Sequence, residues 1–206
     1  NSKATTYTWD ATGAMFVNGV KVMSASQYVT DQLTTTIHPG VDTIFLTVWD
    51  GGGNDTYDFS NYTEAMSIDL SPGGASLFSQ AQRASLGDGV MARGNVYNAY
   101  LYNDDPRSLI ENAIGGSGND TLSGNVAANV LNGGGGADTM SGLAGDDSYV
   151  VDNLDDVVVE AAGEGTDLVY VRVSGYVLSA NVENARSEEG FGNLEIWGNS
   201  AANLMG

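Results

Sequence analysis

The segment from Gly115 to Val150 reads GGSGNDTLS, GNVAANVLN, GGGGADTMS and GLAGDDSYV, which is one nine-residue unit written four times without a break. Each unit begins with glycine, has an acidic or amide residue at its sixth position and an apolar residue at its eighth. Glycine allows tight turns with positive φ, and the alternation that follows is typical of a short strand. A fixed period of this kind predicts stacked coils, two units to a coil of eighteen residues.

The coil predicts which side chains share a core. The four apolar positions point into a thin interior while their neighbours face water, because side chains alternate along a strand. These positions are Leu122, Leu131, Met140 and Tyr149.

The same period places acidic residues above one another. Asp120 and Asp138 are one coil apart on the same edge, and carboxylates stacked at a strand spacing of about 4.8 Å repel unless a cation lies between them. Carboxylates and exposed glycine carbonyls are hard oxygen ligands, which suit Ca²⁺ better than a transition metal. The opposite edge pairs Asn129 with Asp147 and has one charge fewer, so we expect a weaker site there.

The composition limits the classes of partner. The chain has 206 residues, of which 42% are hydrophobic, and 26 acidic against 7 basic residues give a formal charge of -19. This charge excludes a nucleic-acid or anionic-membrane footprint and favours cations as partners. There is no cysteine, so no disulfide supports the fold. No apolar run is long enough to span a membrane, and we expect a monomer.

The chain before the repeats is predicted to be antiparallel β structure. Ala14–Val17 and Val20–Val22 flank Asn18-Gly19, a turn signal for a hairpin. A helix or an irregular connection is expected over 24–33, and a helix is possible over 79–86. Trp49-Asp-Gly-Gly-Gly-Asn-Asp-Thr-Tyr-Asp-Phe59 ends like a repeat unit and predicts a further calcium loop.

After Val150 the repeat frame slips and returns. Residues 151–161 form a unit of eleven positions, which predicts a bulged coil, and Gly163-x-Gly165-x-Asp167-x-Val169 then restores the spacing of glycine, acid and apolar residue. The sequence therefore predicts an all-β protein. It has an antiparallel β subdomain over 1–112 and a parallel β-roll of calcium-binding nonapeptide repeats over 113–206, with Asp147 and Asp167 among the candidate ligands.

Two motifs carry a resemblance to a known family. The loop Trp49–Asp58 and the lead-in Ile110-Glu-Asn-Ala-Ile-Gly-Gly-Ser-Gly-Asn-Asp120 resemble, in this order, the C-terminal part of serralysin-type secreted zinc proteases. The resemblance covers about residues 4 to 142, and beyond Val150 the chain is more similar to RTX proteins in general. One departure is Ala4, where the family usually has an aspartate, which predicts a weaker first calcium site.

The resemblance implies a set of calcium ligands, from side chains and from backbone carbonyls. In the loop and lead-in these are Asp50, Gly52, Gly53, Asp55, Leu109 and Glu111. In the repeats they are Gly116, Gly118, Asp120, Asn125, Ala127, Asn129, Gly134, Gly136 and Asp138.

No catalytic constellation accompanies these ligands. A zinc protease needs two histidines one helical turn apart, and this chain has a single histidine, His38, beside Pro39. The chain is therefore expected to be non-catalytic. The resemblance implies a module that folds on Ca²⁺ outside the cell and supports the secretion and stability of a protease with an upstream catalytic domain. Two alternatives remain open here, namely a fragment of an RTX adhesin or surface-layer protein, and a module of another secreted enzyme.

Overall fold

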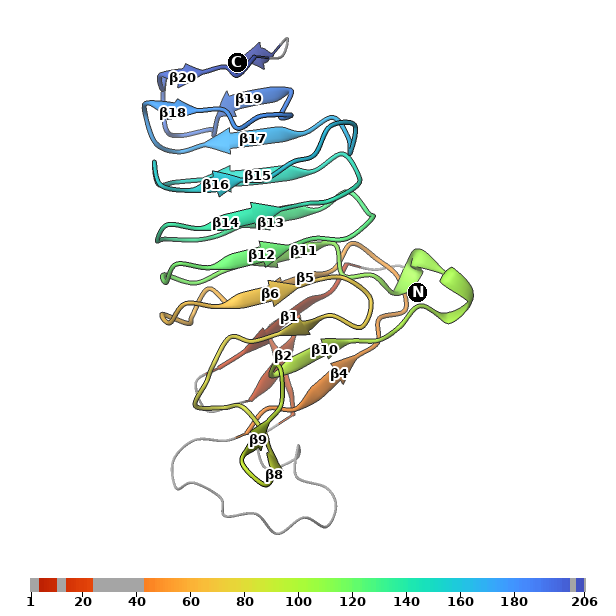
Figure 1. Cartoon of the computed structure of the whole chain (residues 1–206). Coiled ribbons are helices and arrows are strands. Elements are labelled where there is room, and N and C mark those ends of the chain that lie inside the picture. Colours follow the sequence, from red (N-terminus) through yellow and green to blue (C-terminus); the bar gives the residue numbers. More distant parts are fainter. Residues whose placement is uncertain (1–3, 11–13, 24–42, 201–202, 206) are drawn as a thin grey trace.

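The computed structural model describes residues 4–10, 14–23, 43–200 and 203–205. It confirms the predicted all-β roll, in which coils are stacked along one axis (Figure 1). In the described part of the chain, the helical elements are two short 3-10 turns, η2 (Tyr102–Asp104) and η3 (Pro106–Ser108), and no helix is long and apolar enough to cross a membrane. The predicted helix over 79–86 is wrong, because this stretch forms a turn and the start of a strand. The prediction for 24–33 and His38 lie outside the described residues.

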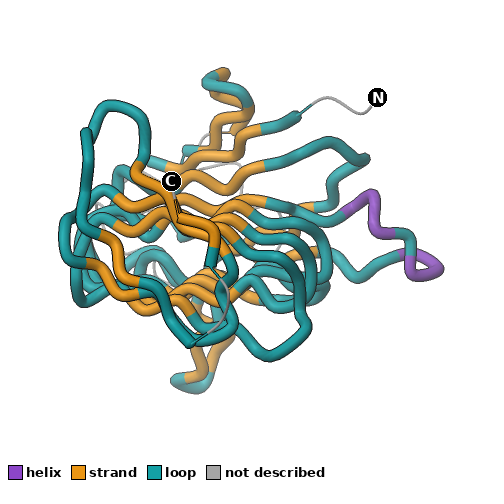
Figure 2. The backbone as a smooth tube through the Cα atoms, turned by 90° about the horizontal axis from the view of Figure 1, so that it is seen from above, coloured by secondary structure: helices purple, strands orange, loops and turns teal. Residues whose placement is uncertain are grey.

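The first wall of the roll is the parallel part of a ten-stranded sheet, in the order β21-β19-β17-β15-β13-β11-β5. Its strands are β5 (Thr56–Asp58), β11 (Asn112–Ile114), β13 (Val130–Asn132), β15 (Ser148–Val151), β17 (Leu168–Val171), β19 (Asn184–Ser187) and β21 (Leu204–Met205). The second wall comprises β6 (Ser67–Asp69), β12 (Thr121–Ser123), β14 (Thr139–Ser141) and β16 (Val157–Val158), followed by the pair β18 (Tyr176–Val177) and β20 (Ile196–Trp197). Seen along the stack, the two walls face each other and the turns lie at their edges (Figure 2).

A thin apolar core lies between the walls. The predicted interior residues Leu122, Leu131, Met140 and Tyr149 are all buried. Leu131 pairs in register with Tyr149 on one wall, and Leu122 pairs with Met140 on the other. Each coil therefore adds two stacked apolar side chains, which makes burial depend on the neighbouring coils.

An antiparallel subdomain continues the long sheet at its N-terminal end. Here β1 (Thr6–Trp9) pairs with β5 in parallel and with β2 (Met15–Val17) in antiparallel fashion, and β2 pairs with β3 (Val20–Met23). The turn residues Asn18 and Gly19 both have positive φ, which agrees with the predicted hairpin. Trp9 packs on Phe59 with ring centroids 5.4 Å apart, so an aromatic cluster fills this end of the roll.

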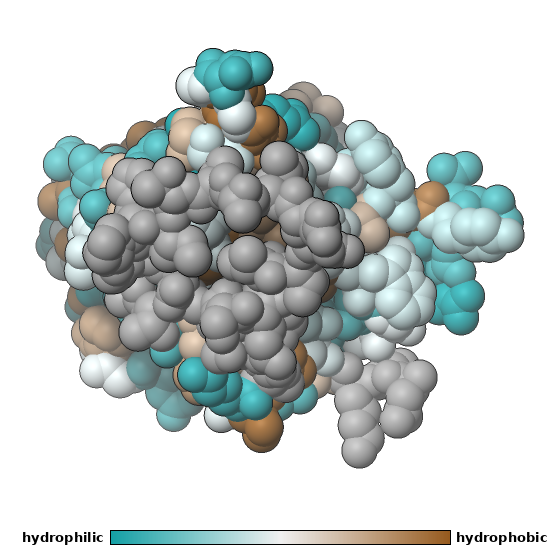
Figure 3. Space-filling model, turned by 90° about the horizontal axis from the view of Figure 1, so that it is seen from below, coloured by the Kyte–Doolittle hydropathy of each residue, from teal (hydrophilic) through white to brown (hydrophobic). Residues whose placement is uncertain are grey.

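The remaining strands lie beside this cluster. They are β4 (Leu46–Val48), β7 (Ala75–Ser76) and β10 (Val96–Asn98), which form a three-stranded sheet, and the hairpin β8 (Ser85–Gly87) with β9 (Val90–Met91). Seen from this end, hydrophilic and hydrophobic residues are intermixed over the visible coloured surface (Figure 3).

The coils differ in length after the regular repeats. Met140 pairs with Val158, eighteen residues on, whereas Ser148 pairs with Leu168, twenty residues on. The two additional residues thus lie between Val158 and Leu168, overlapping the end of the segment 151–161. The sheet is also continuous across the proposed boundary at 112, because β5 pairs with β11.

Candidate metal sites

The residue immediately before each strand of the roll lies at an edge of the stack. Two rows result, one along each edge. The first row contains Asp120, Asp138 and Asp156, which precede β12, β14 and β16. The second row contains Asp55, Glu111, Asn129, Asp147, Asp167, Glu183 and Asn203, which precede the strands of the first wall.

In the first row, each carboxylate accepts a hydrogen bond from the backbone of the coil before it. Asp138 Oδ1 lies 2.7 Å from the backbone nitrogen of Asp120, and Asp156 Oδ1 lies 2.9 Å from that of Asp138. Asp120 Oδ1 in turn accepts from the backbone of Met66 at 2.9 Å. The predicted stacking of Asp120 on Asp138 is therefore present.

The second row follows the same rule. Asp147 Oδ1 accepts from the backbone nitrogen of Asn129 at 2.7 Å, and Asp167 Oδ1 accepts from that of Asp147 at 2.9 Å. Glu183 accepts from Asp167 at 2.9 Å, and Glu111 accepts from Asp55 at 2.7 Å. The three acids of the first row, and Asp55, Asp147 and Asp167 of the second, are buried, whereas Glu111 and Glu183 are half-buried.

The turns that carry these residues are of two kinds, which we call closed and open. In the closed turns 115–120 and 124–129, the backbone nitrogen at the second position donates to a side-chain oxygen at the sixth. Gly116 N donates to Asp120 Oδ2 and Asn125 N donates to Asn129 Oδ1, both at 2.8 Å. The open turns are 133–138 and 142–147. Their second and fourth positions have positive φ, at Gly134, Gly136, Leu143 and Gly145.

The open turns leave one carboxylate oxygen without a protein partner. Asp138 Oδ2 and Asp147 Oδ2 are buried and make no hydrogen bond. A β-carbon on Gly133 would overlap Asp138 Oδ2, and one on Gly142 would overlap Asp147 Oδ2, so glycine keeps space beside both oxygens. A buried carboxylate oxygen without a partner is costly, which makes these two positions suitable for a cation.

Asn129 lies at the sixth position of its unit, as Asp138 and Asp147 do in theirs, but its side chain has no unpartnered oxygen. Its Nδ2 donates to the backbone carbonyl of Glu111 at 2.8 Å, so its amide closes the turn with protein groups alone. Asn125 also uses its amide inside the fold, donating to the carbonyls of Leu70 and Ile110.

The predicted carbonyl ligands of the repeats lie between coils. A β-carbon on Gly134 would meet the carbonyl oxygen of Gly116, one on Gly136 would meet that of Gly118, and one on Gly145 would meet that of Ala127. These carbonyls therefore point along the stack toward the next turn, close to where the open turns leave space.

The predicted loop before the repeats also gathers its acids. Asp50 and Asp55 are buried, and Asp55 Oδ2 makes no protein hydrogen bond. Asp50 accepts from the hydroxyl of Tyr7 at 2.7 Å and from Gly52 N at 2.6 Å, while Glu111 bonds to the backbone of Asp55. Gly53 is exposed in this loop, and Leu109 is buried directly after η3. Glu111 and Asp55 thus lie in contact, and a calcium site shared by all six residues stays a prediction.

Burial makes these carboxylates reluctant to ionise. Removal from water raises the pKa of Asp138 to about 7, with a further contribution from Asp156 and Asp120. Burial likewise raises the pKa of Asp147 and of Asp55 to about 6 each. The folded, metal-free roll therefore binds protons that the unfolded chain, with pKa values of about 4, does not.

This difference predicts a stability that depends on pH in opposite ways with and without metal. A group whose folded pKa is raised contributes most at low pH and loses that contribution as pH rises through the folded value, here about 6 to 7. The metal-free chain should thus become more stable from about pH 8 to about pH 5. With saturating calcium the trend should reverse, because protons then compete with the ion. Thermal melts across this range test the prediction, and parallel trends in the two series would contradict it.

A third acidic residue joins the second row at a position that the sequence analysis missed. Among the described residues, Asp147, Glu160 and Asp167 form a group whose ligand oxygens lie within 4.8 Å of one another, and all three are buried. The expectation of a weak site at Asp147 considered only Asn129 in the coil before it. The coil after it adds two carboxylates. Counting eighteen residues on from Gly142 reaches Glu160, which is the signal that could have found it.

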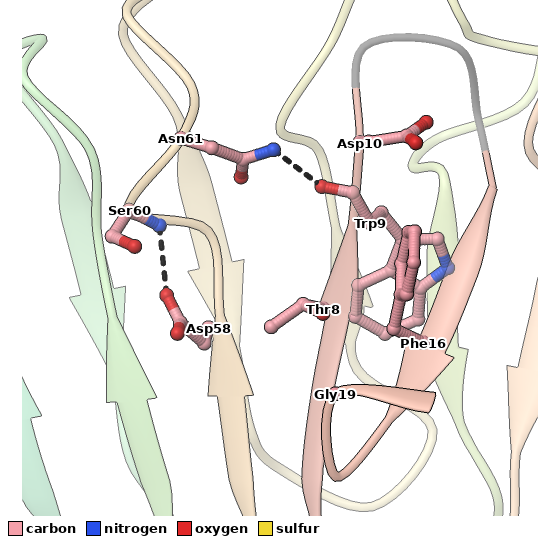
Figure 4. A pocket seen from close by; sticks show the side chains of 8 residues that line it. All are labelled: Thr8, Trp9, Asp10, Phe16, Gly19, Asp58, Ser60 and Asn61. Carbon is pink, nitrogen blue, oxygen red and sulfur yellow. Dashed lines mark hydrogen bonds between the residues drawn. The ribbon is translucent and has the colours of Figure 1, made fainter. Parts of the chain in front are cut away.

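A shallow pocket elsewhere is lined by none of the residues that have an unpartnered carboxylate oxygen. It lies between β1 and β5 and is lined by Thr8, Trp9, Asp10, Phe16, Gly19, Asp58, Ser60 and Asn61 (Figure 4). Asn61 Nδ2 donates to the carbonyl of Trp9 at 2.7 Å, and Asp58 accepts from Ser60 N at 3.0 Å. These groups support the backbone around the pocket, so the carboxylate rows remain the candidate functional sites.

Comparison with known proteins agrees with the architecture. The family model described as the C-terminal part of the M10 peptidase serralysin matches residues 18–177. A serralysin of Photorhabdus laumondii is 45% identical over 89 residues, which are 43% of this chain and 15% of the relative. The metalloprotease AprA of Pseudomonas entomophila is 42% identical over 88 residues, which are 43% of this chain and 15% of the relative. A serralysin of Proteus mirabilis is 40% identical over 90 residues, which are 44% of this chain and 15% of the relative. The chain thus spans a small part of the length of these relatives, and because the family model covers most of its residues, it belongs to the serralysin C-terminal family.

Proposed function

We propose that this chain is a non-catalytic calcium-binding module, which folds on Ca²⁺ outside the cell and supports the secretion and stability of a serralysin-like metalloprotease. The observation that carries the proposal is the pair of buried, unpartnered oxygens at the open turns, Asp138 Oδ2 and Asp147 Oδ2. Each lies in a row of stacked acids. The relatives named serralysin and metalloprotease AprA support the link to an upstream catalytic domain.

The residues present fit calcium. Ca²⁺ accepts six to eight oxygen ligands from carboxylates and carbonyls at about 2.3–2.6 Å, and the open turns combine a free carboxylate oxygen with carbonyls that point along the stack. Asp138 and the carbonyls of Gly116, Gly118, Gly134 and Gly136 would hold one such ion. When bound, the ion supplies the positive charge that the rows themselves lack.

The other predicted sites differ in how many of their side-chain oxygens already accept a hydrogen bond from the protein. Asp120 has partners for both oxygens, and the amide of Asn129 closes its turn, so we expect these closed turns to contribute less than the open ones. Asp50, Asp55 and Glu111 would hold an ion at the N-terminal end of the roll, where Asp55 Oδ2 is free.

Calcium dependence would make folding of the module depend on the compartment in which it lies. Without the ion, a chain of net charge -19 with buried acids resists folding, which suits export in an unfolded state. Outside the cell, ions that bind only the folded chain stabilise it by mass action, by about 2.7 kcal/mol for each site when free calcium is 100 times the dissociation constant. The upstream catalytic domain would then be attached to a module that folds only after export.

Calorimetric titration of the metal-free chain with Ca²⁺ tests the proposal. We expect several ions to bind and the melting temperature to rise. Asp138→Asn and Asp147→Asn should each lower the number of bound ions, because each removes the one free oxygen of an open turn. Asp120→Asn is the matched control in a closed turn and should reduce calcium binding less. A chain that binds no calcium would refute the function, and an equal loss in all three variants would refute the distinction between the turns.

A further inference from the structure

Glu160 is buried in the interior of the roll, where the repeats would have glycine. It lies eighteen positions after Gly142, which begins the last regular unit. In that unit, a β-carbon at Gly142 would overlap Asp147 Oδ2, so the first position of a unit faces the acid at its sixth. Glu160 thus places a carboxylate in a space that the regular repeats keep clear.

The longer coil makes room for this side chain. Asp147 follows Gly142 by five positions, whereas Asp167 follows Glu160 by seven. The two additional residues lie in this turn, since Val158 is still in the regular register and Leu168 is displaced by two. Glu160 therefore reaches Asp167 of its own coil and Asp147 of the coil before.

Protein contacts fix the glutamate with one oxygen free. The hydroxyl of Tyr149 donates to Glu160 Oε1, and Gly142 N donates to that hydroxyl at 2.7 Å. Glu160 Oε2 is buried without a partner, as is Asp147 Oδ2, and Glu160 is only 8% exposed. Two free oxygens therefore belong to one buried group of three acids.

The surrounding charges do not neutralise the group. The charged residues that act on it are themselves acidic, namely Asp146, Glu164 and Glu183. Arg172, just after β17, is paired with Glu188, and Arg186 of β19 donates to the hydroxyl of Tyr170 at 2.6 Å. Three buried carboxylates this close repel one another strongly unless a cation or protons intervene.

We propose that Asp147, Glu160 and Asp167 form a buried calcium site of three carboxylates inside the irregular coil, in which Glu160 adds a third acidic ligand to the site at the open turn 142–147. Their oxygens lie within 4.8 Å of one another, and two ligands of one Ca²⁺ at about 2.4 Å can be no farther apart than about 4.8 Å. A groove bounded by Asp146, Thr166 and Asn184 reaches Asp147 and provides a path for the ion. The choice of calcium rests on the proposed function of the module, whereas the site itself rests on this geometry.

The test compares two glutamate variants of the 206-residue chain. Glu160→Gln keeps the shape and an acceptor for Tyr149 but replaces the free oxygen with an amide. Glu164→Gln is the matched control, because it removes one charge from the same neighbourhood while its side chain only accepts from Ala161 N at 2.7 Å. Calcium stoichiometry by equilibrium dialysis should fall by one ion in Glu160→Gln and stay unchanged in Glu164→Gln.

Three results would overturn the proposal. Glu160→Gln binding as many ions as the parent chain would overturn it, because the free oxygen would then not be a ligand. An equal loss of binding in the two variants would also overturn it, because it would indicate a field effect instead of a ligand. A parent chain that binds no calcium would refute the module's function together with this site. If Glu160→Gln does not fold, anomalous scattering from parent crystals grown with calcium decides: a peak between the three carboxylates supports the site, and no peak there refutes it.

Discussion

Gly134→Ala is expected to destabilise the calcium-loaded chain by about 2–5 kcal/mol, because it combines two separate costs. Gly134 has a φ of +83°, a conformation that costs a residue with a side chain about 1–2 kcal/mol. Its β-carbon would also overlap the carbonyl oxygen of Gly116 in the coil before, and overpacking of this kind costs about 1–3 kcal/mol. Urea unfolding at saturating calcium measures the sum.

Two other glycines separate these costs. Gly163 has nearly the same φ, +84°, but a β-carbon there would meet nothing within 4 Å, so Gly163→Ala should show the conformational cost alone. Gly135 has no positive φ, and its nearest neighbour would be the Cα of Ser117 at 4.0 Å, so Gly135→Ala should be close to neutral. Equal losses for Gly134→Ala and Gly163→Ala would mean that the coils are not stacked as tightly at Gly116 as the structure shows.

The regular repeats could be predicted from sequence because their signal is local. A unit of nine residues determines where the strands begin, and two units determine the coil, so the burial of Leu122 and Leu131 and the stacking of Asp120 on Asp138 follow directly. Tight glycine turns leave few alternatives for the register, since a shift of one residue would expose every apolar side chain.

The difference between open and closed turns could not be predicted. The units at Gly115 and Gly133 both place glycine at positions one, two and four and aspartate at position six, yet only the second has positive φ at Gly134 and Gly136. The φ of glycine is not determined by its own identity, because both signs are accessible to it.

Long-range pairing and the third acid of the irregular coil were also beyond the sequence pattern, although the irregularity itself was predicted. The first coil of the roll uses β5 and β6, and β5 pairs with β11 across more than fifty residues that contain no repeat. Glu160 was missed for a related reason. Its acid lies at a position where the repeat has glycine, so a search for the motif passes over it, and only the register of the coils brings it to Asp147.

Removal of calcium is expected to have the largest effect of all, the loss of the roll itself. The buried rows contain acids such as Asp138, Asp147 and Glu160, each with an oxygen that no protein group satisfies. Leaving a buried charge uncompensated costs about 3–5 kcal/mol, so three such losses are comparable to the whole stability of about 5–15 kcal/mol that is typical of a domain. The aromatic cluster around Trp9 packs Phe59 and Phe78 together, so apolar burial can retain some structure at the N-terminal end.

Far-ultraviolet circular dichroism at neutral pH, with excess chelator and then with excess calcium, tests this central claim most directly. The account predicts that most of the strand signal disappears in chelator and returns when calcium is restored, while magnesium at the same concentration restores less, because its smaller octahedral shell does not suit these flexible oxygen ligands. A strand spectrum that is unchanged after complete removal of calcium would contradict the account, since the roll would then tolerate its buried carboxylates without an ion.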